Sequence, residues 1–173
     1  AFPATIVLAD EAYAEFAGVS SIAALGRLPN LVVARTFSKA YGLAGMRAGV
    51  LLGGRAALSW VARMRSPYPV NSIALLALPA ALADEEWVTR YVSEVRLART
   101  DLAAALGALG VATFPSAANF LVARFGEDAP AIRGALRRRG VLVRDRSDEP
   151  LLRGTLRIGV GTREQVGRFL EAL

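Results

Sequence analysis

A single lysine, Lys39, is the residue with the most distinctive chemistry in this chain of 173 residues. The other twenty basic residues are arginines. An arginine keeps its charge, whereas a lysine amine can lose its proton when desolvated and then act as a nucleophile. The chain has no histidine and no cysteine, so imidazole and thiolate chemistry are excluded and we expect no metal site.

The residues around Lys39 predict a phosphate site that contains an amine. Thr36 and Ser38 place two hydroxyl groups just before the lysine, and Arg47 follows eight residues after it. A guanidinium group donates in a plane that matches phosphate oxygens, and hydroxyl groups add neutral donors. Glycines between Lys39 and Arg47 allow the chain to turn tightly.

Asp10 ends the first apolar run of the sequence and begins the segment Asp10-Glu11-Ala12-Tyr13. The carboxyl ends of strands in an open α/β sheet are where ligands bind, so an acid at this point is well placed for function. An alternative is that the carboxylate only caps the helix or turn that follows the strand.

Short apolar runs predict three strands, at residues 5–9, 31–36 and 48–52. Runs of this kind are typical of strands buried on both faces of an α/β sheet. Helices are expected at residues 21–25, 55–65 and 72–83. A long periodic helix should follow, beginning at the N-cap residue Asp84 and ending near Gly110.

After Gly110 the pattern changes to short strands and two helices. The strands are expected at residues 111–114, 119–125, 141–144 and 155–160, and the helices at residues 129–139 and 163–172. This order fits a small α/β domain, with the long helix as a connecting element. We therefore expect two domains, residues 1–95 and residues 96–173.

Composition limits the classes of partner. The net charge of +6 could suggest a basic module that binds nucleic acid without catalysis, but the arginines are spread along the chain without interleaved aromatic residues. That reading is a remote alternative, and DNA retention that depends on salt would favour it. The longest nearly apolar stretch, residues 73–83, is too short to cross a bilayer. We expect neither a nucleic-acid partner nor a membrane partner.

The motifs together resemble the pyridoxal-phosphate-dependent aminotransferases of fold type I, in particular the histidinol-phosphate aminotransferase branch. The resemblance covers the whole chain and rests on segments 10–13, 38–39, 42–47, 119–121, 140–145 and 156–162. It implies an α/β fold made of part of a large, mostly parallel domain and a small C-terminal α/β domain.

The resemblance implies pyridoxal 5'-phosphate as cofactor and a role for each residue near Lys39. Lys39 would form the internal aldimine and move the proton during transamination. Asp10 would pair with the pyridine nitrogen, and Tyr13 would donate to the phenolic oxygen of the ring. The cofactor phosphate would be bound by Thr36, Ser38 and Arg47. A catalytically inert scaffold is disfavoured because both Lys39 and Asp10 are present.

Substrate contacts are implied at Arg157, which resembles an anion anchor, at Arg144, which resembles a second anion contact, and at Asn119. Two guanidinium groups on one ligand would favour a phosphate over a carboxylate. The alternative for the arginines is an ordinary ion pair with Asp145 or Asp148, and for Asn119 a role in a strand-end turn.

The implied reaction is transamination of histidinol phosphate with glutamate and 2-oxoglutarate as the exchanging pair. An aromatic amino-acid aminotransferase or a threonine-phosphate decarboxylase of the same fold is the alternative. The resemblance also implies a homodimer in the cytoplasm. Family members are considerably longer, so we expect this chain alone to bind cofactor weakly and to turn over little or no substrate.

Overall fold

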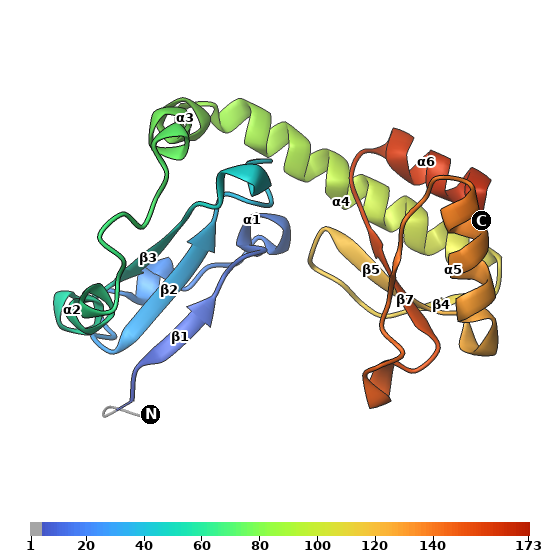
Figure 1. Cartoon of the computed structure of the whole chain (residues 1–173), viewed down its shortest axis with the longest axis horizontal. Coiled ribbons are helices and arrows are strands. Elements are labelled where there is room, and N and C mark those ends of the chain that lie inside the picture. Colours follow the sequence, from blue (N-terminus) through green and yellow to red (C-terminus); the bar gives the residue numbers. More distant parts are fainter. Residues whose placement is uncertain (1–4) are drawn as a thin grey trace. The chain divides into compact units, whose positions relative to one another are not determined.

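A computed structural model describes residues 5–173, which divide between Val88 and Thr89 into two compact units. We call them unit 1 (Ala1–Val88) and unit 2 (Thr89–Leu173). Figure 1 shows the elements of each unit in chain order. The division after residue 95 that the sequence suggested stays a prediction.

Unit 1 contains a three-stranded sheet in the order β1-β2-β3, made of β1 (Val7–Asp10), β2 (Leu31–Thr36) and β3 (Gly49–Gly53). Strands β1 and β2 are parallel, with Asp10 opposite Ala34, and β3 is antiparallel to β2. The short helix α1 (Ala14–Ala17) and the 3-10 turn η1 (Ile22–Ala24) connect β1 to β2. All three expected strands are therefore present.

Burial in this sheet is concentrated on its central strand. Leu31, Val32 and Val33 of β2 are at most 6% exposed, whereas Leu8 of β1 is 60% exposed and Leu51 of β3 is 40% exposed. The expected burial on both faces is thus wrong for the two outer strands. Several apolar side chains of these outer strands therefore face solvent in the part of the chain that the structure describes.

The remaining helices of unit 1 are α2 (Arg55–Arg63) and α3 (Ser72–Ala83), and a 3-10 turn, η2 (Ala44–Met46), precedes β3. Asn71 caps α3 by accepting a hydrogen bond from the backbone of Ala74 at 2.9 Å. Helix α3 is apolar on all sides, yet Ala74 is its one fully buried residue and Leu76 is 82% exposed. A helix that is apolar all round is normally surrounded by protein.

The long helix α4 (Glu85–Ala108) begins as expected at Asp84, whose Oδ1 accepts a hydrogen bond from the backbone of Trp87 at 3.0 Å. Its buried side chains recur every three or four residues, which gives the helix one buried face: Val92, Val95, Ala98, Leu102 and Leu106. Leu109 lies just beyond the helix end and is 64% exposed.

Unit 2 contains a four-stranded antiparallel sheet in the order β4-β5-β7-β6. Its strands are β4 (Ala112–Thr113), β5 (Phe120–Arg124), β6 (Arg144–Asp145) and β7 (Thr155–Gly159). The 3-10 turns η3 (Gly126–Asp128) and η4 (Pro150–Leu152) lie in its connections. Strand β6 is shorter and later than the expected run at residues 141–144.

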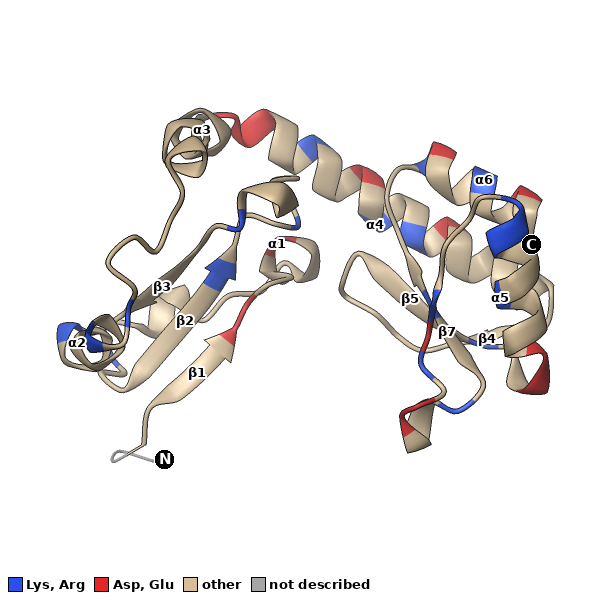
Figure 2. Cartoon of the chain, viewed as in Figure 1, with Lys and Arg blue, Asp and Glu red and all other residues tan. Residues whose placement is uncertain are grey.

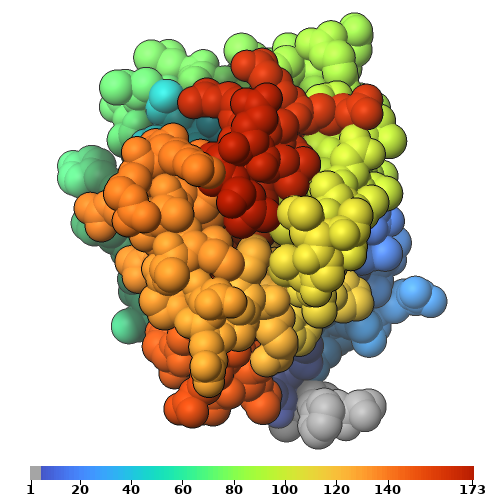
Figure 3. Space-filling model, turned by 90° about the vertical axis from the view of Figure 1, so that its right-hand side faces the viewer, coloured from blue at the N-terminus to red at the C-terminus, as the bar shows by residue number. Residues whose placement is uncertain are grey.

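Helices α5 (Ala129–Arg138) and α6 (Arg163–Ala172) complete unit 2 and lie side by side, in orange and red in Figure 3. Leu136 of α5 and Phe169 of α6 are buried together with Leu121, Leu156 and Ile158 of the sheet. Thr162 and Gln165 form a reciprocal capping box at the start of α6. Unit 2 therefore has a continuous core on one face of its sheet.

Acidic and basic residues are distributed over several elements of both units (Figure 2). Among residues 5–173, no helix has the length and apolar character needed to span a bilayer.

Candidate active site

The candidate site lies at the edge of the unit 1 sheet where β1 and β2 both end. Because the two strands are parallel and Asp10 is opposite Ala34, their carboxyl ends meet at the same edge. Asp10 is the last residue of β1, and Thr36 is the last residue of β2. The chain then enters the loop that carries Lys39.

This loop, residues 37–48, is anchored by buried side chains on either side of Ser38 and Lys39. Phe37 is 7% exposed and Ala40 is fully buried, whereas Ser38 and Lys39 between them are half-buried. The backbone of Phe37 donates to Ala48 at 3.2 Å, which closes the loop at its base. The anchors hold the lysine at the sheet edge.

Gly42 lets this loop reverse direction, since its φ of 69° lies in the left-handed region that favours glycine. The terminal ring carbon of Trp87 would lie 3.4 Å from a Cβ at this position. Glycine therefore meets both the backbone and the space requirement of the turn.

The Lys39 amine lies over the ring of Tyr13, with Nζ 5.6 Å from the ring centroid. This distance is within the range of a cation–π contact. Tyr13 precedes α1, which is fixed to the unit by Phe16, a side chain with 1% exposure. The structure thus brings together two of the three expected catalytic residues, which are 26 positions apart in the sequence.

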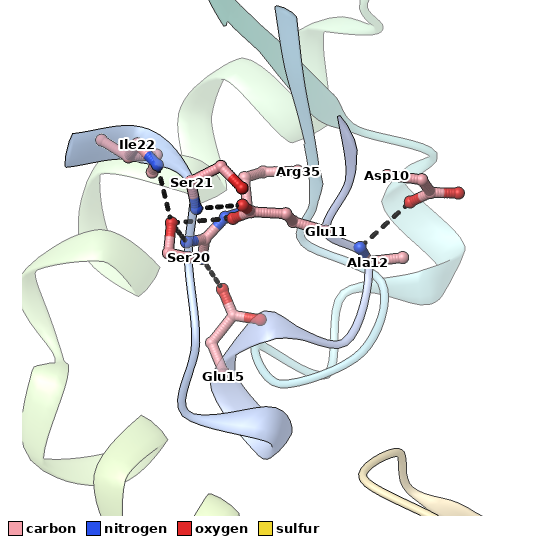
Figure 4. Close-up of polar contacts among 8 residues, drawn as sticks. All are labelled: Asp10, Glu11, Ala12, Glu15, Ser20, Ser21, Ile22 and Arg35. Atoms are coloured by element: carbon pink, nitrogen blue, oxygen red, sulfur yellow. Dashed lines mark hydrogen bonds and ion pairs between the residues drawn. The ribbon is translucent and has the colours of Figure 1, made fainter. Parts of the chain in front are cut away.

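The third, Asp10, has an exposed carboxylate with one oxygen in use. Its Oδ1 accepts a hydrogen bond from the backbone of Ala12 at 3.0 Å, and Figure 4 shows the group directed away from the neighbouring Glu11. Within residues 5–173, Oδ2 makes no hydrogen bond. The turn-capping alternative is therefore realised by one oxygen, and the other remains available to a ligand.

The three expected phosphate contacts come from the two ends of the loop. Thr36 Oγ1 accepts a hydrogen bond from the backbone of Ser38 at 3.1 Å. Arg47, at the other end, has a left-handed backbone, and its Nη1 donates to the carbonyl of Ala44 at 2.9 Å. Thr36 and Ser38 thus share one turn, but no contact among the described residues joins Arg47 to them.

A hollow of about 390 Å³ lies beside this edge. Asp10 and Tyr13 are among the residues that line it, together with Ser20 and Ser21. Lys39 is not one of its lining residues. The hollow therefore adjoins the segment 10–13 and not the loop of the lysine.

Sequence reasoning missed Arg35, which connects β2 to the segment that follows β1. Its guanidinium group contacts Glu11, which follows Asp10 in the sequence, and Glu15, which lies two residues after Tyr13 (Figure 4). The signal that could have drawn attention to it was a charged residue inside an otherwise apolar strand run.

In unit 2, Arg144 and Arg157 lie directly opposite each other on β6 and β7. The guanidinium carbon of Arg157 is 4.2 Å from the ring centroid of Phe120 on β5. Like charges at directly opposed positions destabilise a sheet, so this pair is suited to an anion that neutralises it. The side chains of such a cross-strand pair share one face of the sheet.

The ion-pair alternative for these arginines is not found in the part of the chain that the structure describes. Asp145 is instead 3.8 Å from Arg133 of α5. Side-chain and backbone hydrogen bonds from Ser147, helped by the charge of Arg133, lower the pKa of Asp145. Asn119 precedes β5, and its carbonyl accepts a hydrogen bond from Val160 at 2.8 Å, as a strand-end residue would.

Comparisons with known proteins agree with this arrangement. The family model described as aminotransferase class I and II matches residues 4–173. The chain is 44% identical to a histidinol-phosphate aminotransferase of Roseiflexus castenholzii, over 97% of this chain and 47% of that protein. The chain spans about half the length of the curated relatives it matches.

Solved structures give the same result. A histidinol-phosphate aminotransferase from Sinorhizobium meliloti, in complex with pyridoxal-5'-phosphate, is similar with a TM-score of 0.87 and 32% identity, over 99% of this chain and 48% of that one. An L-threonine-O-3-phosphate decarboxylase from Porphyromonas gingivalis is similar with a TM-score of 0.86 and 28% identity, over 99% of this chain and 55% of that one.

The expected fold class is confirmed by these matches: the chain is α/β and has part of the fold type I architecture. The match of the family model over nearly the whole chain shows that it belongs to the class I and II aminotransferases.

Proposed function

We propose that this chain is part of a pyridoxal-phosphate-dependent aminotransferase that acts on histidinol phosphate, with glutamate and 2-oxoglutarate as the exchanging pair, in histidine biosynthesis. The observation that carries the proposal is the position of the Lys39 amine, over Tyr13 and at the sheet edge where Asp10 ends β1. No other side chain in the sequence offers an amine.

The residues at this edge fit pyridoxal 5'-phosphate by their chemistry. The cofactor supplies an aldehyde and a ring that accepts electrons. Asp10 offers a carboxylate oxygen to a protonated ring nitrogen, and Tyr13 offers a phenol to an anionic oxygen. The phosphate would be held by the donors at the ends of the loop, Thr36, Ser38 and Arg47.

Lys39 is also the group that would hold and move a proton at this site. Its Nζ can alternate between amine and ammonium, whereas the guanidinium group of an arginine stays protonated. The Tyr13 ring lies beneath this Nζ at a cation–π distance of 5.6 Å. The two side chains therefore form a unit in which the phenol orients the amine.

The arginine pair supports a phosphorylated substrate. Arg144 and Arg157 are opposed across β6 and β7, and among residues 5–173 no ion pair neutralises either of them. A doubly charged phosphate would offset both cations, whereas a carboxylate would offset one. Asn119 is proposed as a further substrate contact at the start of β5.

Decarboxylation of threonine phosphate is the second candidate, because the similar Porphyromonas gingivalis structure is a decarboxylase of that substrate. Both substrates carry a phosphate group, so the arginine pair does not separate them. An aromatic amino-acid donor, which has no phosphate, is less favoured by the same pair.

A chimera tests the proposal. In it, this chain replaces the matching region of the Roseiflexus castenholzii relative, and the unaltered relative is the positive control. We expect amino transfer from histidinol phosphate to 2-oxoglutarate by the chimera and little or none by the 173-residue chain alone. Carbon dioxide release from threonine phosphate would favour the second candidate. Normal turnover by the 173-residue chain alone would contradict the expectation that activity also needs the region of the relatives that this chain does not match.

Arginine variants of the chimera test the substrate assignment. Arg144→Met and Arg157→Met should raise the KM for histidinol phosphate, while the cofactor stays bound. Equal losses for a donor that lacks a phosphate would show that the pair does not select that group.

We further propose a cytoplasmic homodimer, as the resemblance implies, with the domain boundary after residue 95. Large exposed apolar side chains in unit 1, such as Trp60 and Met64, support a surface that additional polypeptide covers. Light scattering of the chimera and fractionation of cells that express the whole protein test the two assignments.

A further inference from the structure

Arg35, the next-to-last residue of β2, uses three guanidinium nitrogens to hold the segment that follows β1. Nε donates to Glu11 Oε2 at 2.9 Å, Nη1 donates to Glu15 Oε1 at 2.7 Å, and Nη2 donates to Ser20 Oγ at 2.9 Å. Figure 4 shows the three acceptors gathered around this one side chain. We call these four residues the Arg35 clamp.

The acceptors of the clamp are themselves connected. Ser20 Oγ donates to Glu11 Oε2 at 2.8 Å, and the other Glu11 oxygen accepts a hydrogen bond from the backbone of Ser21. Burial alone would raise the pKa of Glu11, but the hydrogen bonds from Ser21 and Ser20 and the charge of Arg35 outweigh it and lower that pKa. Glu11 is therefore held as a carboxylate.

The clamp is also better shielded than the ion pair of Arg163 and Asp101 in unit 2. The side chains of Arg35 and Glu11 are 20% and 10% exposed, whereas those of Arg163 and Asp101 are 61% and 49% exposed at the same Nε-to-oxygen distance of 2.9 Å. Hydrogen-bonded charges that are shielded from water hold their geometry more firmly than exposed pairs.

The clamp residues flank the candidate catalytic residues in the sequence. Glu11 follows Asp10, and Glu15 lies two residues after Tyr13. Arg35 precedes Thr36, the start of the loop that carries Lys39. Each contact of Arg35 therefore connects the segment after β1, which contains Tyr13, to the end of β2, which leads into the loop of Lys39.

We propose that Arg35 is a positioning residue: through Glu11 and Glu15 it fixes the segment 10–15 against β2 and so holds the Tyr13 ring beneath the Lys39 amine. Arg35 touches neither side chain of that pair in any contact described. The inference rests on the proposed function for the importance of the pair, but its geometry can be tested without cofactor.

The single lysine makes the test specific. Lysine labelled with 13C at Cε gives one resonance in the 173-residue chain, from Lys39. The Tyr13 ring should displace this resonance by its ring current, and Tyr13→Leu measures that displacement. We expect Arg35→Met to lose most of it and Arg35→Lys, which keeps a cation, to retain more.

The matched control is Arg163→Met, which removes an exposed ion pair of the same distance in unit 2 and should leave the Lys39 resonance in place. Backbone hydrogen exchange of residues 10–21 should rise in Arg35→Met and stay unchanged in the control. A Lys39 resonance that keeps its Tyr13-dependent displacement in Arg35→Met, while this exchange rises, would show a merely structural tie and overturn the proposal.

A second result would also contradict the proposal. If Tyr13→Leu does not move the Lys39 resonance, the contact that Arg35 is proposed to maintain is absent, and the proposal fails. Because no cofactor is present, such a failure is distinct from the failure of the chimera to transfer an amino group. Arg35→Met in the chimera then adds a pH profile of the bound cofactor's visible absorbance, which should shift if Tyr13 is displaced.

Discussion

Unit 1 carries the single lysine on an incompletely covered sheet, whereas unit 2 carries the arginine pair on a sheet with a well-formed core. Of the exposed large apolar side chains among residues 5–173, sixteen lie in unit 1 and five in unit 2. Unit 2 buries Leu102, Leu106 and Leu156 completely. The difference indicates that unit 2 has a more complete core of its own than unit 1 has.

Separating the units should give the largest effect. A fragment of residues 84–173 keeps the N-cap of α4 and the whole core of unit 2, so we expect it to unfold cooperatively on heating. A fragment of residues 1–83 should show no cooperative transition, because its apolar side chains remain in water. Circular dichroism melts of both fragments check this, and a cooperative melt of residues 1–83 would break the comparison.

A pair of leucine variants tests the difference in burial between the two units. Leu102→Ala removes a fully buried side chain from α4 in unit 2 and should lower the free energy of unfolding of that unit by about 3 kcal/mol. Leu76→Ala removes an exposed side chain from α3 in unit 1 and should change the free energy of unfolding of unit 1 by less than about 0.5 kcal/mol. Urea titrations measure both. Equal losses would mean that α3 is covered when the chain stands alone.

Two glycine variants should change the free energy of unfolding in opposite directions. A Cβ at Gly49 would lie 2.7 Å from the carbonyl oxygen of Arg35, so Gly49→Ala must push β3 from β2 and should cost about 1–3 kcal/mol. Gly134 lies inside α5, where a Cβ meets nothing nearer than 3.5 Å, and Gly134→Ala should stabilise by about 0.5–1 kcal/mol. Urea midpoints provide the comparison, and stabilisation by Gly49→Ala would contradict the close packing of β2 and β3.

Acid should destabilise both units through carboxyl groups whose pKa is lowered in the folded state, and this effect on stability should be the smallest. The pKa of Asp145 in unit 2 and that of Glu11 in unit 1 are lowered. A carboxyl group with a lowered folded-state pKa stabilises above its unfolded value of about 4 and loses that contribution as the pH falls through the folded value. Asp145→Asn and Glu11→Gln should therefore flatten the stability profile below about pH 4. Thermal melts at several pH values measure this. A melting temperature that falls with acid as steeply in the variants as in the unaltered chain would contradict the assigned hydrogen bonds.

Local features of the site could be predicted from the sequence, because they depend on neighbouring residues. Lys39 stands out by its uniqueness, and Asp10 by its place at the end of an apolar run. The hydrogen bond from the backbone of Ser38 to Thr36 was not among the predictions. The expected phosphate role of Arg47 stays a prediction.

Features set by distant partners could not be predicted in this way. Arg35 contacts Glu11 and Glu15 across 24 and 20 positions, and no short-range pattern signals that pairing. The opposition of Arg144 and Arg157 depends on the register of β6 and β7, which an interval of thirteen residues does not determine. An apolar run does not show how far a strand is covered, so the runs at β1 and β3 suggested more burial than these outer strands have.

The most direct test of the central claim is reductive trapping of pyridoxal 5'-phosphate on the 173-residue chain. Borohydride fixes the cofactor on the amine it reaches, and mass spectrometry of the digested chain locates it. We predict attachment at Lys39, faster than at the same lysine in an unstructured peptide of residues 36–42 and slowed by Asp10→Asn. Attachment confined to the α-amino group, or a rate at Lys39 no higher than in the peptide, would contradict the assignment of this sheet edge as the cofactor site.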